Sequence, residues 1–159
     1  MRSAAAAAAG MNADGINMIL RRVCGDAFCR VYPWNQLPNP KSRLCLFVVN
    51  TDCHHLPGTH WIAIRLEKDG EGEYFDPLGR QPAGQLAAYM KKNCAHWTFN
   101  EKQLQSLSSR FCGHYCVFYC AYSSLGFSMQ HITSMFTNDT GMNDVLVHHF
   151  VCQRRKNSS

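Results

Sequence analysis

Four side chains with complementary chemistry follow one another along the chain: His60, Asp76, Gln105 and Cys112. A thiolate attacks a carbonyl carbon, and an imidazole passes the protons that this attack requires. A carboxylate orients the imidazole, and an amide N–H stabilises the oxyanion that forms. Taken singly, these residues have ordinary structural explanations: a core histidine, a turn aspartate, a surface glutamine and a buried cysteine. Together they favour cleavage of a peptide bond by a thiol.

Cys112 stands where a long apolar stretch begins. Residues 111–125 are apolar on nearly all sides, which predicts a buried helix. A cysteine at the N-terminus of that helix would have its thiolate favoured by the helix dipole and by a protonated histidine nearby. We expect Gly113 to leave room for a substrate backbone, because it has no Cβ atom.

His60 and Asp76 are predicted to lie on neighbouring strands. Alternation in the strand expected over residues 60–67 places His60 on the same face as Ile64, and we expect the helix that follows Cys112 to cover that face. A hairpin centred near Gly70 would set Asp76 opposite Ile64, roughly 13 Å along the strand from His60. A register shift, a bulge or a strong twist must therefore bring the two side chains together.

The whole pattern predicts an α+β fold with a small central mixed or antiparallel sheet flanked by helices. Apolar runs and alternation predict strands over residues 44–49, 60–67, 73–76 and 96–99. Apolar residues at helical spacing predict helices over residues 14–25, 86–92 and 111–125, and a further helix capped by Ser128. A last helix carries the apolar stripe Met142, Val145, Leu146, His149 and Phe150. Three prolines, at positions 33, 38 and 40, indicate irregular backbone there.

Length and charge limit the classes to consider. A chain of 159 residues suits one domain, and we expect a disordered leader over residues 1–10, a single domain over 11–152 and a basic polar tail over 153–159. No segment approaches the roughly 20 apolar residues of a membrane span, so no membrane partner is expected. The net charge is +5, but only residues 21–22 and 154–156 form basic clusters, which is weak support for binding nucleic acid.

The cysteines leave a different class of function open. There are nine, and without a secretory signal they suggest a reducing compartment and mostly unpaired, buried thiols. Cys112, Cys116 and Cys120 share one helix side, and residues 53–55 form a Cys-His-His cluster, so a zinc-binding interaction module is one alternative. Zinc sites normally use cysteine pairs two to four residues apart with a matching second pair, so we expect no metal. A catalytically idle interaction domain is another alternative.

Several segments together resemble the adenovirus-type cysteine protease (adenain) family, which includes relatives in virus-like mobile elements. The similar segments are residues 43–51, the Gly-Thr-His-Trp of 58–61, the Tyr-Phe-Asp-Pro-Leu-Gly of 74–79, and Gln105 followed by the Cys-Gly-His-Tyr-Cys of 112–116. The resemblance covers most of residues 15–135. Many family members have glutamate where this chain has Asp76, and either carboxylate can orient an imidazole.

The resemblance implies a thiol endopeptidase with Cys112 as nucleophile, His60 as general base and acid, Asp76 as orienting group and Gln105 as oxyanion donor. It implies processing of viral or virus-like precursor proteins, usually after glycine, during particle maturation. The expected setting is the nucleus or cytoplasm of a host cell and the virion, and the expected state is a monomer. The same catalytic layout occurs in SUMO-type peptidases, so trimming of a ubiquitin-like modifier is the alternative.

Activation is a further implication of the resemblance. Members of the adenoviral family are stimulated by DNA and by a short viral peptide that forms a disulfide with a cysteine upstream of the glutamine. Cys94 lies in the matching neighbourhood. No cofactor is expected for the chemistry itself.

Overall fold

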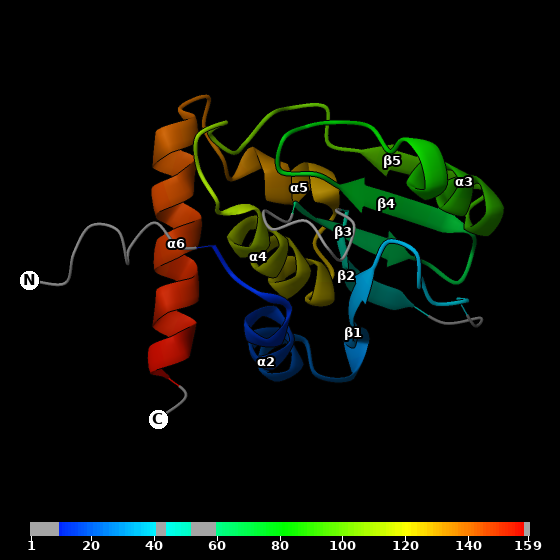
Figure 1. Ribbon diagram of the computed structural model, residues 1–159, viewed down its shortest axis with the longest axis horizontal. Coiled ribbons are helices and arrows are strands. Elements are labelled where there is room, and N and C mark those ends of the chain that lie inside the picture. Colours follow the sequence, from blue (N-terminus) through cyan, green and yellow to red (C-terminus); the bar gives the residue numbers. More distant parts are fainter. Residues whose placement is uncertain (1–9, 41–43, 52–59, 158–159) are drawn as a thin grey trace, which may run out of the picture.

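The computed structural model describes residues 10–40, 44–51 and 60–157. In this part of the chain, five strands form one sheet in the order β1-β2-β3-β4-β5, with helices on both of its faces (Figure 1). The strands are β1 (Phe28–Pro33), β2 (Cys45–Asn50), β3 (Trp61–Leu66), β4 (Glu71–Phe75) and β5 (His96–Phe99). The helices are α2 (Ala13–Cys24), the short η1 (Gly25–Ala27), α3 (Gly84–Asn93), α4 (Cys112–Ser124), α5 (Met129–Ser134) and α6 (Thr140–Lys156). The predicted α+β fold is confirmed.

The sheet is mixed. Strands β2, β3 and β4 are antiparallel neighbours, whereas β1 and β5 each run parallel to the strand beside them. Strand β1 was not predicted, because its last residue is Pro33 and the prolines were read as irregular backbone. A proline can end an edge strand, where one side of the backbone needs no ladder partner.

Two apolar cores lie on the two faces of the sheet. On one face, Leu46, Val48 and Ala63 pack with helices α2, α4, α5 and α6. On the other face, Phe47, Val49, Ile62, Ile64 and Leu66 pack with helix α3. Helix α4 is therefore enclosed by the sheet and the other helices, which explains why its sequence is apolar on all sides (Figure 1).

This arrangement corrects the expected place of His60. The isoleucines of β3 face α3, so the prediction that α4 covers the face bearing Ile64 was wrong. Strand β3 begins at Trp61, and His60 precedes it, where the alternation of a pleated strand no longer fixes the direction of a side chain. His60 reaches the N-terminus of α4 from the end of the sheet.

The helix termini follow local capping chemistry. Asn12 caps α2 by accepting the N–H of Gly15, so the helix begins one residue before the predicted range. Ser128 caps α5 as predicted, by accepting the N–H of His131. These side chains satisfy backbone donors that the first turn of a helix leaves without a partner.

Helix α6 buries a different face from the one its apolar stripe indicates. Met142, Val145 and Leu146 are 59%, 61% and 39% exposed, whereas the polar Asn143 and Asp144 are buried. The polar pair turns inward because it meets groups that need partners. Asn143 Nδ2 donates to the carbonyl of Leu104 (3.1 Å), and Asp144 Oδ1 accepts the hydroxyl of Tyr115 (2.7 Å). The helix continues through Lys156, so most of the expected basic tail is helical.

No helix within the described ranges is long and apolar enough to cross a membrane.

Candidate active site

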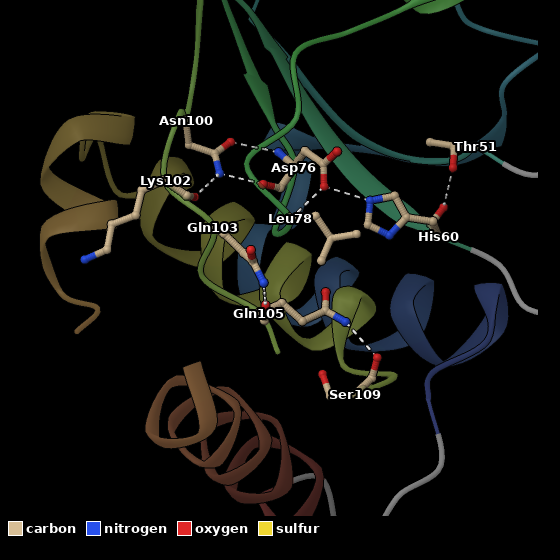
Figure 2. Close-up of polar contacts among 9 residues, drawn as sticks. All are labelled: Thr51, His60, Asp76, Leu78, Asn100, Lys102, Gln103, Gln105 and Ser109. Carbon is tan, nitrogen blue, oxygen red and sulfur yellow. Dashed lines mark hydrogen bonds and ion pairs between the residues drawn. The ribbon is translucent and has the colours of Figure 1, made fainter. Parts of the chain in front are cut away.

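The imidazole of His60 contacts the carboxylate of Asp76, with 2.7 Å between Nε2 and Oδ1 (Figure 2). The register of β3 and β4 explains this contact. Ala63 pairs with Phe75 and Ile64 with Tyr74, so Asp76 continues the ladder opposite Ile62, two residues from His60. The predicted register, with Asp76 opposite Ile64, was two residues off. The apparent gap of roughly 13 Å therefore halves, and the two side chains span the rest.

A tight turn fixes the carboxylate of Asp76. Its Oδ1 also accepts the backbone N–H of Leu78 (2.9 Å), and its carbonyl accepts the N–H of Gly79 (2.8 Å). Gly79 has φ of 72°, and a Cβ atom there would lie 2.7 Å from the backbone nitrogen of Gln103. Glycine is therefore required at this position, both for the backbone conformation and for the close approach of the next segment.

His60 also hydrogen-bonds the thiol of Cys112. Because Nε2 contacts Asp76, Nδ1 is the ring nitrogen left to exchange a proton with the sulfur. Burial acts to lower the pKa of His60, but the hydrogen bonds to Asp76 and Cys112 and the charges of these two groups raise it from 6.5 to about 9. The imidazole is therefore protonated at neutral pH, and an adjacent imidazolium favours the thiolate of a cysteine.

The raised pKa of His60 also links this site to stability. The folded-state pKa, about 9, exceeds the unfolded value of 6.5. The folded protein thus binds the proton more tightly, and the contact with Asp76 stabilises it fully only below about pH 6.5. That contribution is lost as the pH rises through about 9.

Cys112 is the first residue of α4 and is 6% exposed. The two cysteines that follow it along the helix, Cys116 and Cys120, are completely buried. Burial raises the pKa of both far above the usual value, and neighbouring thiols raise it further. Cys112 alone of the three lines a cleft.

We expect a small alkylating agent such as iodoacetamide to modify Cys112 first. The imidazole of His60 beside its sulfur, together with its place on the cleft surface, should make Cys112 react at least about tenfold faster than the other thiols. The internal control is the partly exposed Cys152, which lies outside the cleft with its sulfur 3.7 Å from Nε2 of His148. Peptide mapping by mass spectrometry at short times measures both. Equal labelling of Cys112 and Cys152 would contradict a reactive thiol.

Gln105 lies in the same cleft and is 3% exposed. Its Nε2 donates one hydrogen to the carbonyl of Ser109 (3.0 Å), as Figure 2 shows, while its Oε1 is buried without a hydrogen-bond partner. An amide nitrogen carries two hydrogens, so one remains for an oxyanion. The backbone N–H of Cys112 stands at the first position of α4, where the helix itself supplies no acceptor for it.

The cleft that joins these groups has a volume of about 800 Å³. Its walls come from separate parts of the chain: the residues before α2, the start of β3, the turn at Leu78 and the segment 105–112. Met11, Trp61, Leu78 and Leu107 make part of the wall apolar. The structure thus brings His60, Asp76, Gln105 and Cys112 to one place, three of them on the cleft surface and Asp76 behind His60.

Gly113 has a different role from the one expected. A Cβ atom on it would lie 3.2 Å from Met11 and from Ile16, and 3.4 Å from Trp61. The missing side chain therefore lets α4 approach α2 and β3 closely, and no space for a substrate backbone lies there. The indole of Trp61 donates to the carbonyl of Met11 (3.2 Å) and so completes the packing.

Asn100 was missed by sequence reasoning. It follows β5 directly, is 5% exposed, and binds both backbone groups of Asp76 (Figure 2). The sequence signal that could have identified Asn100 is its position: it is an asparagine directly after the strand predicted over residues 96–99. In the structure that strand, β5, runs parallel to β4, the strand that leads into Asp76.

Cys94 lies far from the cleft in the fold. It follows α3, on the face of the sheet opposite α4, with its sulfur in the space that a Cβ on Gly72 would need. Burial, followed by the charge of Glu71, raises its pKa. Among the described residues, no group of three or more His, Cys, Asp or Glu side chains could hold a metal ion, and the Cys-His-His cluster at 53–55 lies outside those residues.

Comparison with solved structures identifies the fold. The pS273R protease of ASFV superimposes with a TM-score of 0.64 and 20% identity, over 89% of this chain and 67% of that one. A selenomethionine form of the same protease gives 0.62 and 21%, over 89% and 68%. The central domain of the uncharacterized protein Lpg1148 from Legionella pneumophila gives 0.57 and 15%, over 92% and 97%. No family model and no curated protein matches the chain.

The chain therefore has the fold of the ASFV pS273R protease.

Proposed function

We propose that this protein is a thiol endopeptidase that processes viral or virus-like precursor proteins during particle maturation, with Cys112 as its nucleophile. The observation that carries the proposal is the position of His60, which contacts Asp76 on one side and hydrogen-bonds Cys112 on the other, inside a cleft that also holds Gln105. The fold shared with the ASFV pS273R protease supports a peptidase.

The residues account for each step of the reaction. The Cys112 thiolate attacks the carbonyl carbon of the scissile peptide bond, and the second N–H of Gln105 holds the oxyanion together with the N–H of Cys112. The His60 imidazolium gives its proton to the leaving amine, and the bond to nitrogen breaks. A water molecule then loses a proton to His60 and hydrolyses the thioester, which restores the thiolate.

The burial of the nucleophile supports cleavage after glycine. Cys112 is 6% exposed, and Trp61 lines the cleft beside it. The scissile carbonyl of a substrate can approach the buried Cys112 sulfur most easily when the substrate residue that carries this carbonyl is glycine, which has no side chain. Alanine at that position should already reduce kcat/KM by about 10-fold or more, because a misplaced carbonyl loses much of its reactivity.

A parallel digestion tests the proposal. The parent protein is incubated with a library of peptides that differ at the residue before the scissile bond, and separately with a SUMO precursor. We expect cleavage after glycine in the peptides, read by mass spectrometry. Rapid trimming of the SUMO precursor without cleavage of peptides would favour the ubiquitin-like-modifier alternative, and no cleavage of either would contradict a peptidase.

Activation by a peptide at Cys94 and by DNA belongs to the same proposal. The buried position of Cys94 means that a disulfide there would require α3 to move away from β4. The basic ends of α2 and α6, at residues 21–22 and 154–156, are the surfaces on which nucleic acid would act.

A further inference from the structure

Asn100 binds both backbone groups of the residue that orients the histidine. Its Oδ1 accepts the N–H of Asp76 (2.8 Å), and its Nδ2 donates to the carbonyl of Asp76 (2.5 Å). Nδ2 also lies 3.4 Å from the carbonyl of Lys102. At 5% exposure, the amide is shielded from water, so these bonds have no solvent competitor (Figure 2).

The position of Asn100 in the sheet explains the geometry. Strands β4 and β5 are parallel, and their last ladder pair is Tyr74 with Phe99. One step beyond, the backbone ladder stops, and the side-chain amide of Asn100 supplies a donor and an acceptor in its place. The Asn100 side chain therefore binds the backbone of Asp76 as a neighbouring strand would, although the chain turns at the next residue, Pro77.

The same turn supports the oxyanion residue. The carbonyl of Pro77 accepts the N–H of Leu104 (2.9 Å) and the N–H of Gln105 (3.0 Å). Residues 100–105 thus contact the Asp76 turn at both ends: through the Asn100 side chain at one end and through Pro77 at the other. A shift of the turn would move the carboxylate and the amide of Gln105 together.

We propose that Asn100 is the positioning residue of this site, which holds Asp76 against His60 and couples that contact to the placement of Gln105. The inference rests on the proposed function, since it assigns Asn100 a role in the same reaction. It differs from a purely structural role in one respect: removal of both bonds between Asn100 and Asp76 must lower the pKa of His60.

The charged groups around His60 define what should be measured. Asp76 and Cys112 act on His60 directly, and Arg110 lines the same cleft as the only Lys or Arg among its described lining residues. Asn100→Leu leaves all three in place but removes both bonds to Asp76. We expect the pKa of His60, followed by NMR of its imidazole signals, to fall from about 9 toward 6.5. His60→Gln identifies the signals.

Asn100→Asp distinguishes positioning from simple loss of packing. It keeps the acceptor for the N–H of Asp76, loses the donor, and adds negative charge near His60. We expect the pKa of His60 to stay at or above the parent value in this variant, opposite to Asn100→Leu. In both, kcat for a cleaved peptide should fall by about 10- to 100-fold with KM nearly unchanged, because small misplacements of catalytic groups are costly.

Asn17→Leu is the control. Asn17 is a partly buried asparagine of α2 whose Oδ1 accepts the backbone N–H of Val31 on β1 (3.0 Å), away from Asp76 and from residues 100–105. Its replacement should lower stability while leaving the pKa of His60 unchanged. The inference is overturned if Asn100→Leu leaves that pKa at the parent value in folded protein. The proposed function fails separately, if the parent protein cleaves nothing although the pKa of His60 responds as described.

Discussion

Replacement of Cys112 by alanine is expected to abolish peptide cleavage while the protein stays folded. The reaction depends on a sulfur nucleophile, and removing one member of such a set leaves only the small catalysis of the remaining groups, a loss of roughly 10⁴-fold or more. Cys112 lines the cleft, so its truncation opens no large cavity in the core. Circular dichroism and thermal unfolding check the fold, and a coupled peptide assay measures the rate.

Cys152→Ala is the control for this experiment. Cys152 is partly exposed on α6 and does not line the cleft. Its replacement should leave kcat/KM within about twofold, as expected for a surface substitution outside the site. Activity that survives in Cys112→Ala, or disappears equally in Cys152→Ala, would contradict the assignment of the nucleophile.

Asp76→Asn is expected to reduce kcat by about 10²–10⁴-fold and to change the pH dependence as well. The amide is nearly isosteric, so the turn with Leu78 and the backbone bonds to Asn100 can persist. The contact with His60 loses its charge, however. Burial still lowers the pKa of His60, and the hydrogen bond and charge of Asp76 no longer raise it. The alkaline limb of kcat/KM, expected near pH 9 in the parent, should move toward neutral pH.

The direction in which the alkaline limb of kcat/KM moves distinguishes loss of the Asp76 charge from unfolding. A loss of activity through unfolding alone would leave the alkaline limb of the remaining activity where it was. Asp139→Asn provides the comparison: Asp139 caps α6 through its carboxylate, and asparagine is an equally good cap. Asp139→Asn should leave both kcat and the pH of the alkaline limb of kcat/KM unchanged. A limb that moves to higher pH in Asp76→Asn would contradict the role of the carboxylate.

Much of the fold could be predicted from the sequence because its signals are local. Apolar runs and alternation identified β2, β3 and β5 to within about one residue, and the apolar sequence that opens at residue 111 identified α4. The four chemical side chains could be selected by type and order, since each role admits few residues. Strand β1 was missed because proline at an edge looks, in sequence, like proline in a loop.

The remaining features depend on contacts between distant segments. The face of β3 that α4 covers cannot be derived from alternation alone, because both faces of this sheet are apolar. The register that brings Asp76 to His60 depends on the turn between β3 and β4, and a shift of two residues preserves the alternation. Asn143 and Asp144 turn inward on α6 because of a carbonyl and a hydroxyl that belong to other elements. No single window of sequence contains that information.

The enclosure of α4 has a consequence for biosynthesis. His60 and Asp76 lie at the ends of strands β3 and β4, which are made early, whereas the sulfur lies on a helix whose core also includes residues of α5 and α6. A nascent chain on the ribosome can form the sheet before its nucleophile has a fixed place, because α5 and α6, which complete the core around α4, are synthesised after the sheet. We therefore expect synthesis to pass α6 before any polypeptide in the cell is exposed to a competent thiol.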